Sequence, residues 1–180
     1  MKSDSFLLSK RMFSEKVSVY KNNRFTLEFK FKHLDFYNEI YYLRKIKKFD
    51  LMFSNIKKYT KSYFKKKKLN FSILLTNDAE IKEINYKYRN LNKPTNVLSF
   101  PNDDISVKQT KNIGDIAISI EYVKAEAKKE GKTFDDHIIH MLAHGVYHIL
   151  GYDHENNENA MIMENKEIQI LKKINISNPY

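Results

Sequence analysis

Three histidines near the carboxyl end of the sequence have the spacing of a metal site. His144 and His148 lie four residues apart in a segment with helical apolar spacing, so their imidazole rings share one helix face. Gly151 stands where this helix should end, because glycine adopts the left-handed backbone conformation that reverses the chain. That reversal can bring His154 back to the same face as a third ligand. Three neutral imidazoles leave one position open for water, which is typical of a catalytic zinc site.

The identity of the ligands and of the ion follows from composition. Four of the six histidines fall within residues 140–154, which favours a shared ion over separate core or surface histidines. The sequence has no cysteine, so a metal can be bound only through His, Asp or Glu. We expect one Zn²⁺ ion, although imidazole also suits nickel, copper and iron.

The residue after the first histidine separates two kinds of hydrolase. The ligand pattern H-x-x-x-H-x-x-G-x-x-H is that of the metzincin peptidases, whose general base is a glutamate at this position. Here the residue is Gly145, which cannot accept a proton, so a peptidase would lack its base. A phosphodiester fits better, because the ion can bind a phosphoryl oxygen and lower the pKa of bound water to roughly 7. In RNA the neighbouring 2′-hydroxyl is an alternative nucleophile.

Phosphate chemistry also needs a cation near the substrate, and Arg89 is the candidate. It follows the apolar stripe of Ile81, Ile84 and Tyr88 and is the only arginine after Arg44. Its planar guanidinium can bind a phosphate beside the metal and offset charge in the transition state. The structural alternative is an arginine placed favourably at the carboxyl end of a helix.

The expected elements give an α+β fold: a single domain with a small, mixed, twisted sheet packed against helices, and the metal site on a late helix and the following turn. Strands are predicted at residues 25–31, 71–75, 97–100 and 114–120. Helices are predicted across 35–68, after 76–78, and at 121–130, 134–150 and 157–173, with a mobile polar loop at 102–112. Thr133 is the expected N-cap of the helix that carries His144.

Charge is distributed unevenly along the chain. Residues 1–70 hold 19 Lys and Arg against 6 Asp and Glu, whereas residues 71–180 hold 13 against 16. The basic run at 57–68 is interleaved with aromatic residues and would attract RNA, although a solvated surface gives the same pattern. We expect residues 1–22 to be a loosely ordered extension and 23–180 to be the catalytic domain. No segment suits a membrane span or a secretory signal, so we expect a cytoplasmic protein.

Three blocks of sequence resemble the YbeY family of bacterial endoribonucleases, also described as rRNA maturation factors. Residues 144–154 read His-Gly-Val-Tyr-His-Ile-Leu-Gly-Tyr-Asp-His, similar to the family pattern H-G-x-L-H-L-x-G-Y-D-H. The second block comprises 85–89 and 93–101, and Gly114 opens a third. The resemblance covers roughly residues 70–170.

This resemblance implies specific roles. His144, His148 and His154 would bind zinc, and Arg89 would be the functional arginine. The implied activity is metal-dependent cleavage of single-stranded RNA in 16S rRNA 3′-end maturation and ribosome quality control. The implied partners are the rRNA precursor and the small ribosomal subunit, and His140 falls where many members carry a histidine.

Further residues have two interpretations each. Asp153 can orient a ligand imidazole or stabilise the turn, and His140 can bind substrate or be a buried histidine. Asn96 is a candidate substrate contact in a loop that it shapes with Thr95, whereas Asp115 is expected to be structural. Two other functions stay open: an unusual metzincin-like metallopeptidase, and a non-catalytic RNA-binding ribosome assembly factor whose metal is structural.

Overall fold

The computed structural model describes residues 17–21, 25–30, 69–110 and 112–180. The strands in these ranges are β1 (Val17–Lys21), β2 (Phe25–Lys30), β3 (Leu69–Thr76), β4 (Val97–Pro101) and β5 (Gly114–Ser119). The helices are α5 (Asp78–Arg89), α6 (Asp104–Thr110), α7 (Ile120–Lys129), α8 (Phe134–Ile149) and α9 (Asn157–Lys172). The helices predicted across 35–68 and the basic run at 57–68 lie outside the described residues.

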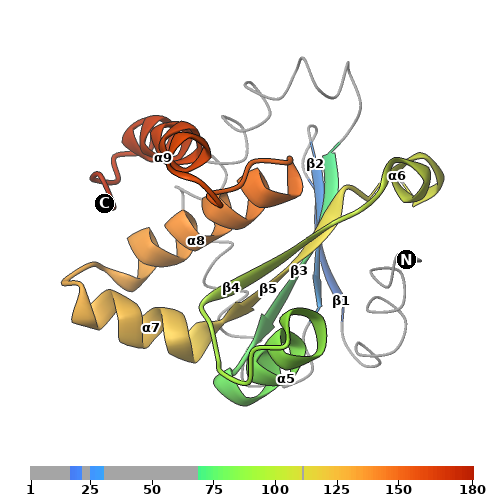
Figure 1. Cartoon of the computed structure of the whole chain (residues 1–180), viewed down its shortest axis with the longest axis horizontal. Coiled ribbons are helices and arrows are strands. Elements are labelled where there is room, and N and C mark those ends of the chain that lie inside the picture. The colour runs from blue at the N-terminus through green and yellow to red at the C-terminus, as the bar shows by residue number, and fades with distance from the viewer. Residues whose placement is uncertain (1–16, 22–24, 31–68, 111) are drawn as a thin grey trace.

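The strands form one mixed sheet in the order β1-β2-β3-β5-β4 (Figure 1). β2, β3 and β5 run parallel, while β1 and β4 are antiparallel to their neighbours. The predicted α+β fold with a small mixed sheet is therefore confirmed.

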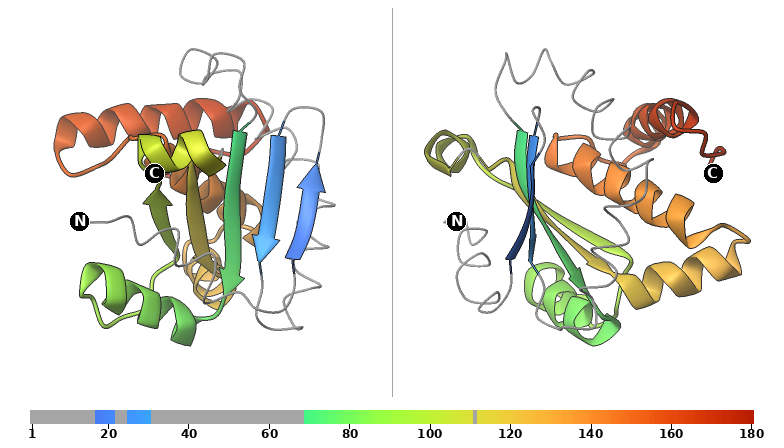
Figure 2. Two further views of the ribbon diagram at one scale, coloured as in Figure 1. Left: turned by 90° about the vertical axis from the view of Figure 1, so that its right-hand side faces the viewer. Right: turned by 180° about the vertical axis from the view of Figure 1, so that it is seen from behind.

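Both faces of the central strands are buried, because apolar residues fill alternate and intervening positions. Ile73 and Ile118 pack in the main core with residues of α8 and α9. Leu74 and Ala117 point the other way and pack with Ile81 of α5. The molecule thus has α5 on one face of the sheet and α8, with α9 beyond it, on the other (Figure 2).

Two segments differ from the sequence-based expectations. Residues 104–110 form the short helix α6 instead of a mobile loop, because local contacts close it: the Asp103 Oδ1 atom accepts a hydrogen bond from the Ser106 amide at 2.7 Å. α6 buries no residue, so it lacks the apolar stripe by which a helix is recognised in sequence. Within the expected extension at 1–22, residues 17–21 form β1, which pairs with β2; residues 1–16 lie outside the described part.

Among the described helices, none combines the length and the apolar character that a membrane crossing requires.

Candidate metal centre

α8 carries two of the three candidate ligands and lies close against the sheet. It begins as predicted, with the Thr133 hydroxyl accepting a hydrogen bond from the Asp136 amide at 3.1 Å. A Cβ atom at Gly145 would lie 3.1 Å from Ile116 Cγ2 and 3.2 Å from Ser99 Oγ. The face of α8 that bears Gly145 therefore points into the sheet, and a longer side chain there would crowd Ile116 and Ser99.

The turn after α8 returns the chain to the ligand face. Gly151 has a φ of 90°, and the Tyr152 amide donates to the Tyr147 carbonyl at 3.1 Å. This left-handed ending places the third histidine beside the first two. The ring centre of His154 is 5.4 Å from that of His144 and 4.9 Å from that of His148. The histidine triad, defined as His144, His148 and His154, thus comes together as its spacing predicts.

The nitrogen atoms of the triad converge on one point. One ring nitrogen from each histidine lies within 4.8 Å of the others, and the Nε2 atoms of His144 and His148 are 3.0 Å apart. Two ligands of a tetrahedral zinc ion at about 2.0–2.1 Å would be separated by about 3.3 Å. The separation of the donor atoms therefore suits a zinc-sized cation.

The other ring nitrogens fix the tautomers of the α8 ligands. His148 Nδ1 is 3.1 Å from the Tyr152 carbonyl oxygen, which can only accept, so Nδ1 carries the proton. His144 Nδ1 likewise donates to Glu167 Oε1 at 3.0 Å. When both rings are neutral, their Nε2 atoms present lone pairs to each other, and a cation between them removes the repulsion. This is the strongest indication in the structure itself that the triad binds a metal.

Electrostatics also keep the site ready to bind a cation. Burial, followed by the charges of His144 and His154, lowers the pKa of His148 to about 4, so this imidazole is neutral at pH 7. Burial would raise the pKa of Glu167, but hydrogen bonds from His140 and His144 outweigh it and lower this pKa to about 2. Glu167 is therefore a buried anion that contacts the Nδ1 atom of His144.

Arg89 is the last residue of α5 and is exposed. Its charge contributes to the low pKa of His148, so the guanidinium lies within electrostatic range of the triad. Asn90, in the left-handed conformation with a φ of 58°, ends α5 immediately after it. α5 and α8, from opposite faces of the sheet, thus bring a cation and the ligands to the same region.

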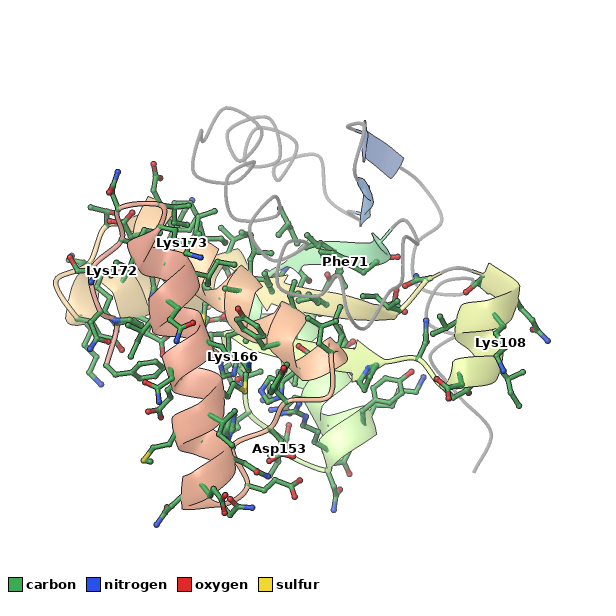
Figure 3. The ribbon with its side chains drawn as sticks, turned by 90° about the horizontal axis from the view of Figure 1, so that it is seen from above. Phe71, Lys108, Asp153, Lys166, Lys172 and Lys173 are labelled. Carbon is green, nitrogen blue, oxygen red and sulfur yellow. The ribbon has the colours of Figure 1, made fainter. Side chains whose placement is uncertain are left out.

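The remaining candidates lie in separate networks. Asn96 Nδ2 donates to Glu126 Oε2 at 3.0 Å, and Asn96 Oδ1 accepts from the Val97 amide at 2.7 Å. Asp153, in the connection between α8 and α9 (Figure 3), accepts hydrogen bonds from the Glu155 amide and from Asn159 Nδ2. These contacts stabilise loops, and the orientation of the α8 ligands comes from other groups, namely Glu167 and the Tyr152 carbonyl.

Two further predicted residues have defined partners. His140 is buried and directs Nε2 at Glu167 Oε2, 2.9 Å away. Burial lowers the pKa of His140, although the hydrogen bond to Glu167 opposes this. Asp115 Oδ1 accepts a hydrogen bond from Asn112 Nδ2 at 3.3 Å.

Glu167 is the site residue that the sequence analysis missed. It is fully buried in α9, on the same face as Met163, Ile170 and Leu171. A carboxylate at an apolar position of a helix was the available signal, because such a group requires buried donors.

Comparisons with known proteins identify a family for this chain. The family model described as "Endoribonuclease YbeY" matches residues 37–175. The chain is 50% identical over 100 residues to Endoribonuclease YbeY of Bartonella bacilliformis, covering 54% of this chain and 63% of that protein. It is 48% identical over 103 residues to Endoribonuclease YbeY of Acinetobacter baumannii, covering 54% and 65%. The chain thus spans under two thirds of the length of these curated relatives.

One solved structure is also similar. It is the solution structure of a Thermotoga maritima protein that is 28% identical to this chain, with a TM-score of 0.46. The match covers 68% of this chain and 81% of the Thermotoga maritima chain.

Proposed function

The chain belongs to the family described as Endoribonuclease YbeY, and on this premise we propose that it is a zinc-dependent endoribonuclease that cleaves single-stranded RNA. The observation that carries the proposal is the convergence of three ring nitrogens, with the Nε2 atoms of His144 and His148 3.0 Å apart and His154 beside them. Such a set of imidazole donors suits a divalent ion with an open coordination position. When bound, the ion would polarise a phosphoryl oxygen and lower the pKa of a water ligand to about 7.

The protein residues divide the remaining tasks. The triad would hold the ion, while Glu167 and the Tyr152 carbonyl keep the Nδ1 atoms of His144 and His148 protonated. Arg89, exposed at the end of α5, would bind a phosphate oxygen and offset the negative charge of the transition state.

The packing around Gly145 supports RNA rather than a peptide as substrate. A metzincin-like peptidase needs a glutamate at this position, and its Cβ atom alone would crowd Ile116 and Ser99. Position 145 faces the sheet, so a glutamate there would require Ile116 and Ser99 to shift. Phosphodiester cleavage does not require it, since metal-bound water or a ribose hydroxyl can be the nucleophile.

The proposed biological substrate is the 3′ end of the 16S rRNA precursor, in cytoplasmic ribosome maturation and quality control. Two lines of reasoning support it: membership of the family, and a sequence whose first 70 residues carry a large excess of positive charge. Mapping the 16S rRNA 3′ end in cells depleted of the protein tests this assignment. Unprocessed ends should accumulate, and wild-type protein but not His148→Ala should remove them.

Activity can be tested with purified protein and three substrates. A fluorescent single-stranded RNA should be cleaved by wild type and not by His148→Ala, while a DNA oligomer of the same sequence and casein stay intact. Casein hydrolysis that His148→Ala abolishes would instead identify a peptidase. Tight RNA binding without cleavage in the presence of Zn²⁺ would identify an assembly factor. Analysis of the product ends, cyclic or simple phosphate, then distinguishes the two nucleophiles.

A further inference from the structure

One carboxylate inside the protein receives three hydrogen bonds from two segments, two from α8 and one from the segment after α9. Glu167 Oε1 accepts from His144 Nδ1 at 3.0 Å. Glu167 Oε2 accepts from His140 Nε2 at 2.9 Å and from the Tyr180 hydroxyl at 2.7 Å. The Tyr180 ring also meets the His140 ring edge-on, with ring centres 5.5 Å apart.

The Tyr180 hydroxyl is a necessary partner for this carboxylate. Glu167 has no exposed surface, and a buried ion is stable only when donors replace the water that it has lost. Two imidazoles and one hydroxyl donate to this carboxylate, so each donor carries a large share of the compensation. Loss of one donor would free Oε2 to rotate toward another partner and would draw Oε1 away from His144.

The segment after α9 holds Tyr180 in place. Ile174 and Ile176 are buried in the main core, which directs the chain back along α8. Lys132 Nζ donates to the Pro179 carbonyl at 2.8 Å, so the backbone next to Tyr180 is bound to the loop before α8. Tyr180 as a residue is 55% exposed, but its hydroxyl reaches the buried carboxylate.

We propose that Tyr180 is a positioning residue of the metal centre, acting through Glu167 on His144. Its hydroxyl holds Oε2, so that Oε1 stays on His144 Nδ1 and the His144 Nε2 lone pair stays directed at the triad. The inference rests on the proposed metal binding of the triad. It assigns to the last segment of the chain a function at a site formed by α8 and the turn after it.

The test measures Zn²⁺ affinity by competition with a chelator in wild type and three full-length variants. Loss of a hydrogen-bonding partner of a ligand lowers metal affinity by about 10–100-fold, and Tyr180 acts one contact further away, so Tyr180→Phe should lower it about 3–10-fold. Tyr180→Ala should behave like Tyr180→Phe, because both lack the hydroxyl. The matched control is Tyr147→Phe, which removes a hydroxyl that donates to the Lys166 carbonyl of α9 rather than to Glu167.

A second measurement detects the positioning directly. In the metal-free protein, the His144 Nδ1 proton should give a slowly exchanging downfield NMR resonance, because it is hydrogen-bonded to a buried carboxylate. Tyr180→Phe should accelerate its exchange with solvent, and Tyr147→Phe should not.

The outcomes separate this inference from the proposed function. The inference is supported if both Tyr180 variants bind Zn²⁺ more weakly and exchange the His144 Nδ1 proton faster, while Tyr147→Phe does neither. Wild-type affinity in Tyr180→Phe would overturn it and leave the proposed function intact, as would an equal loss in Tyr147→Phe, which would indicate a general packing effect. Absence of Zn²⁺ binding by the wild type would overturn both.

Discussion

Five histidines lie on α8 and the turn after it, and they form two groups with opposite use of their ring nitrogens. The inner histidines, defined as His137 and His140, direct Nε2 at the carboxylates of Glu126 and Glu167. Within the described part of the chain, their buried Nδ1 atoms have no hydrogen-bond partner. In the triad, His144 and His148 use Nδ1 for a protein acceptor and direct Nε2 at a common point.

The difference shows that helical spacing alone does not make a metal site. His137 and His140 are three residues apart on one helix, yet their ring centres are 6.0 Å apart, against 4.6 Å for His144 and His148. In each imidazole, one ring nitrogen donates to a protein acceptor, and only the other nitrogen can bind a metal. Glu167 contacts one member of each group, His140 through Nε2 and His144 through Nδ1, and therefore links them.

The largest effect should follow from removing a triad member. His148→Ala should abolish stoichiometric Zn²⁺ binding and lower RNA cleavage by about a thousandfold or more, because two imidazoles remain and the nucleophile is no longer activated. Metal analysis of the purified variant and single-turnover cleavage measure this. Full metal content in His148→Ala would contradict the prediction that the triad, unlike the inner histidines, binds the metal.

Arg89→Ala should reduce cleavage by about 100–1000-fold, the usual effect of removing one donor to a developing negative charge. Its metal content should stay stoichiometric, since Arg89 contributes charge and no ligand atom. Metal analysis and cleavage rates on the same sample check both statements. Loss of metal in this variant would contradict the assigned role.

Glu167→Gln should lower Zn²⁺ affinity by about 10–100-fold. The amide has one acceptor oxygen in place of two, so at least one of the three donors on Glu167 loses its acceptor. Chelator competition measures the change. Unchanged affinity would mean that the link between the inner histidines and the triad has no influence on the metal.

The smallest effect on the metal should come from an inner histidine. His137→Gln should leave Zn²⁺ affinity within about twofold of wild type, because His137 contacts Glu126 and no member of the triad. It should lower the free energy of unfolding by about 1–3 kcal/mol through loss of a buried hydrogen bond. Chemical denaturation and chelator competition together test this, and a large loss of affinity would refute the separation of the two groups.

The sequence predicted the features that depend on local spacing. The face shared by His144 and His148, the reversal at Gly151 and the N-cap at Thr133 follow from rules that act within one turn of a helix. The apolar residues at 71–75 and 114–120 likewise predicted strands, which the structure forms as β3 and β5.

The missed features depend on tertiary contacts. Glu167 and Tyr180 enter the site only because α9 and the segment after it pack on α8. β1 exists through its pairing with β2, and spacing in the sequence carries no information on such partners. The short helix α6 was missed for another reason: a local polar contact begins it, and it buries no residue, so it has no apolar stripe.

The carbonyl of Tyr152 orients His148 and belongs to the same turn that ends α8. Every amino acid supplies this oxygen, so replacing the side chain at position 152 leaves the hydrogen bond intact. Scanning by point mutation would therefore overlook one of the two groups that orient the α8 ligands. Inserting a residue between Leu150 and Tyr152 would reveal its role, as would replacing the peptide bond between Tyr152 and Asp153 with an ester, whose carbonyl oxygen is a weaker acceptor.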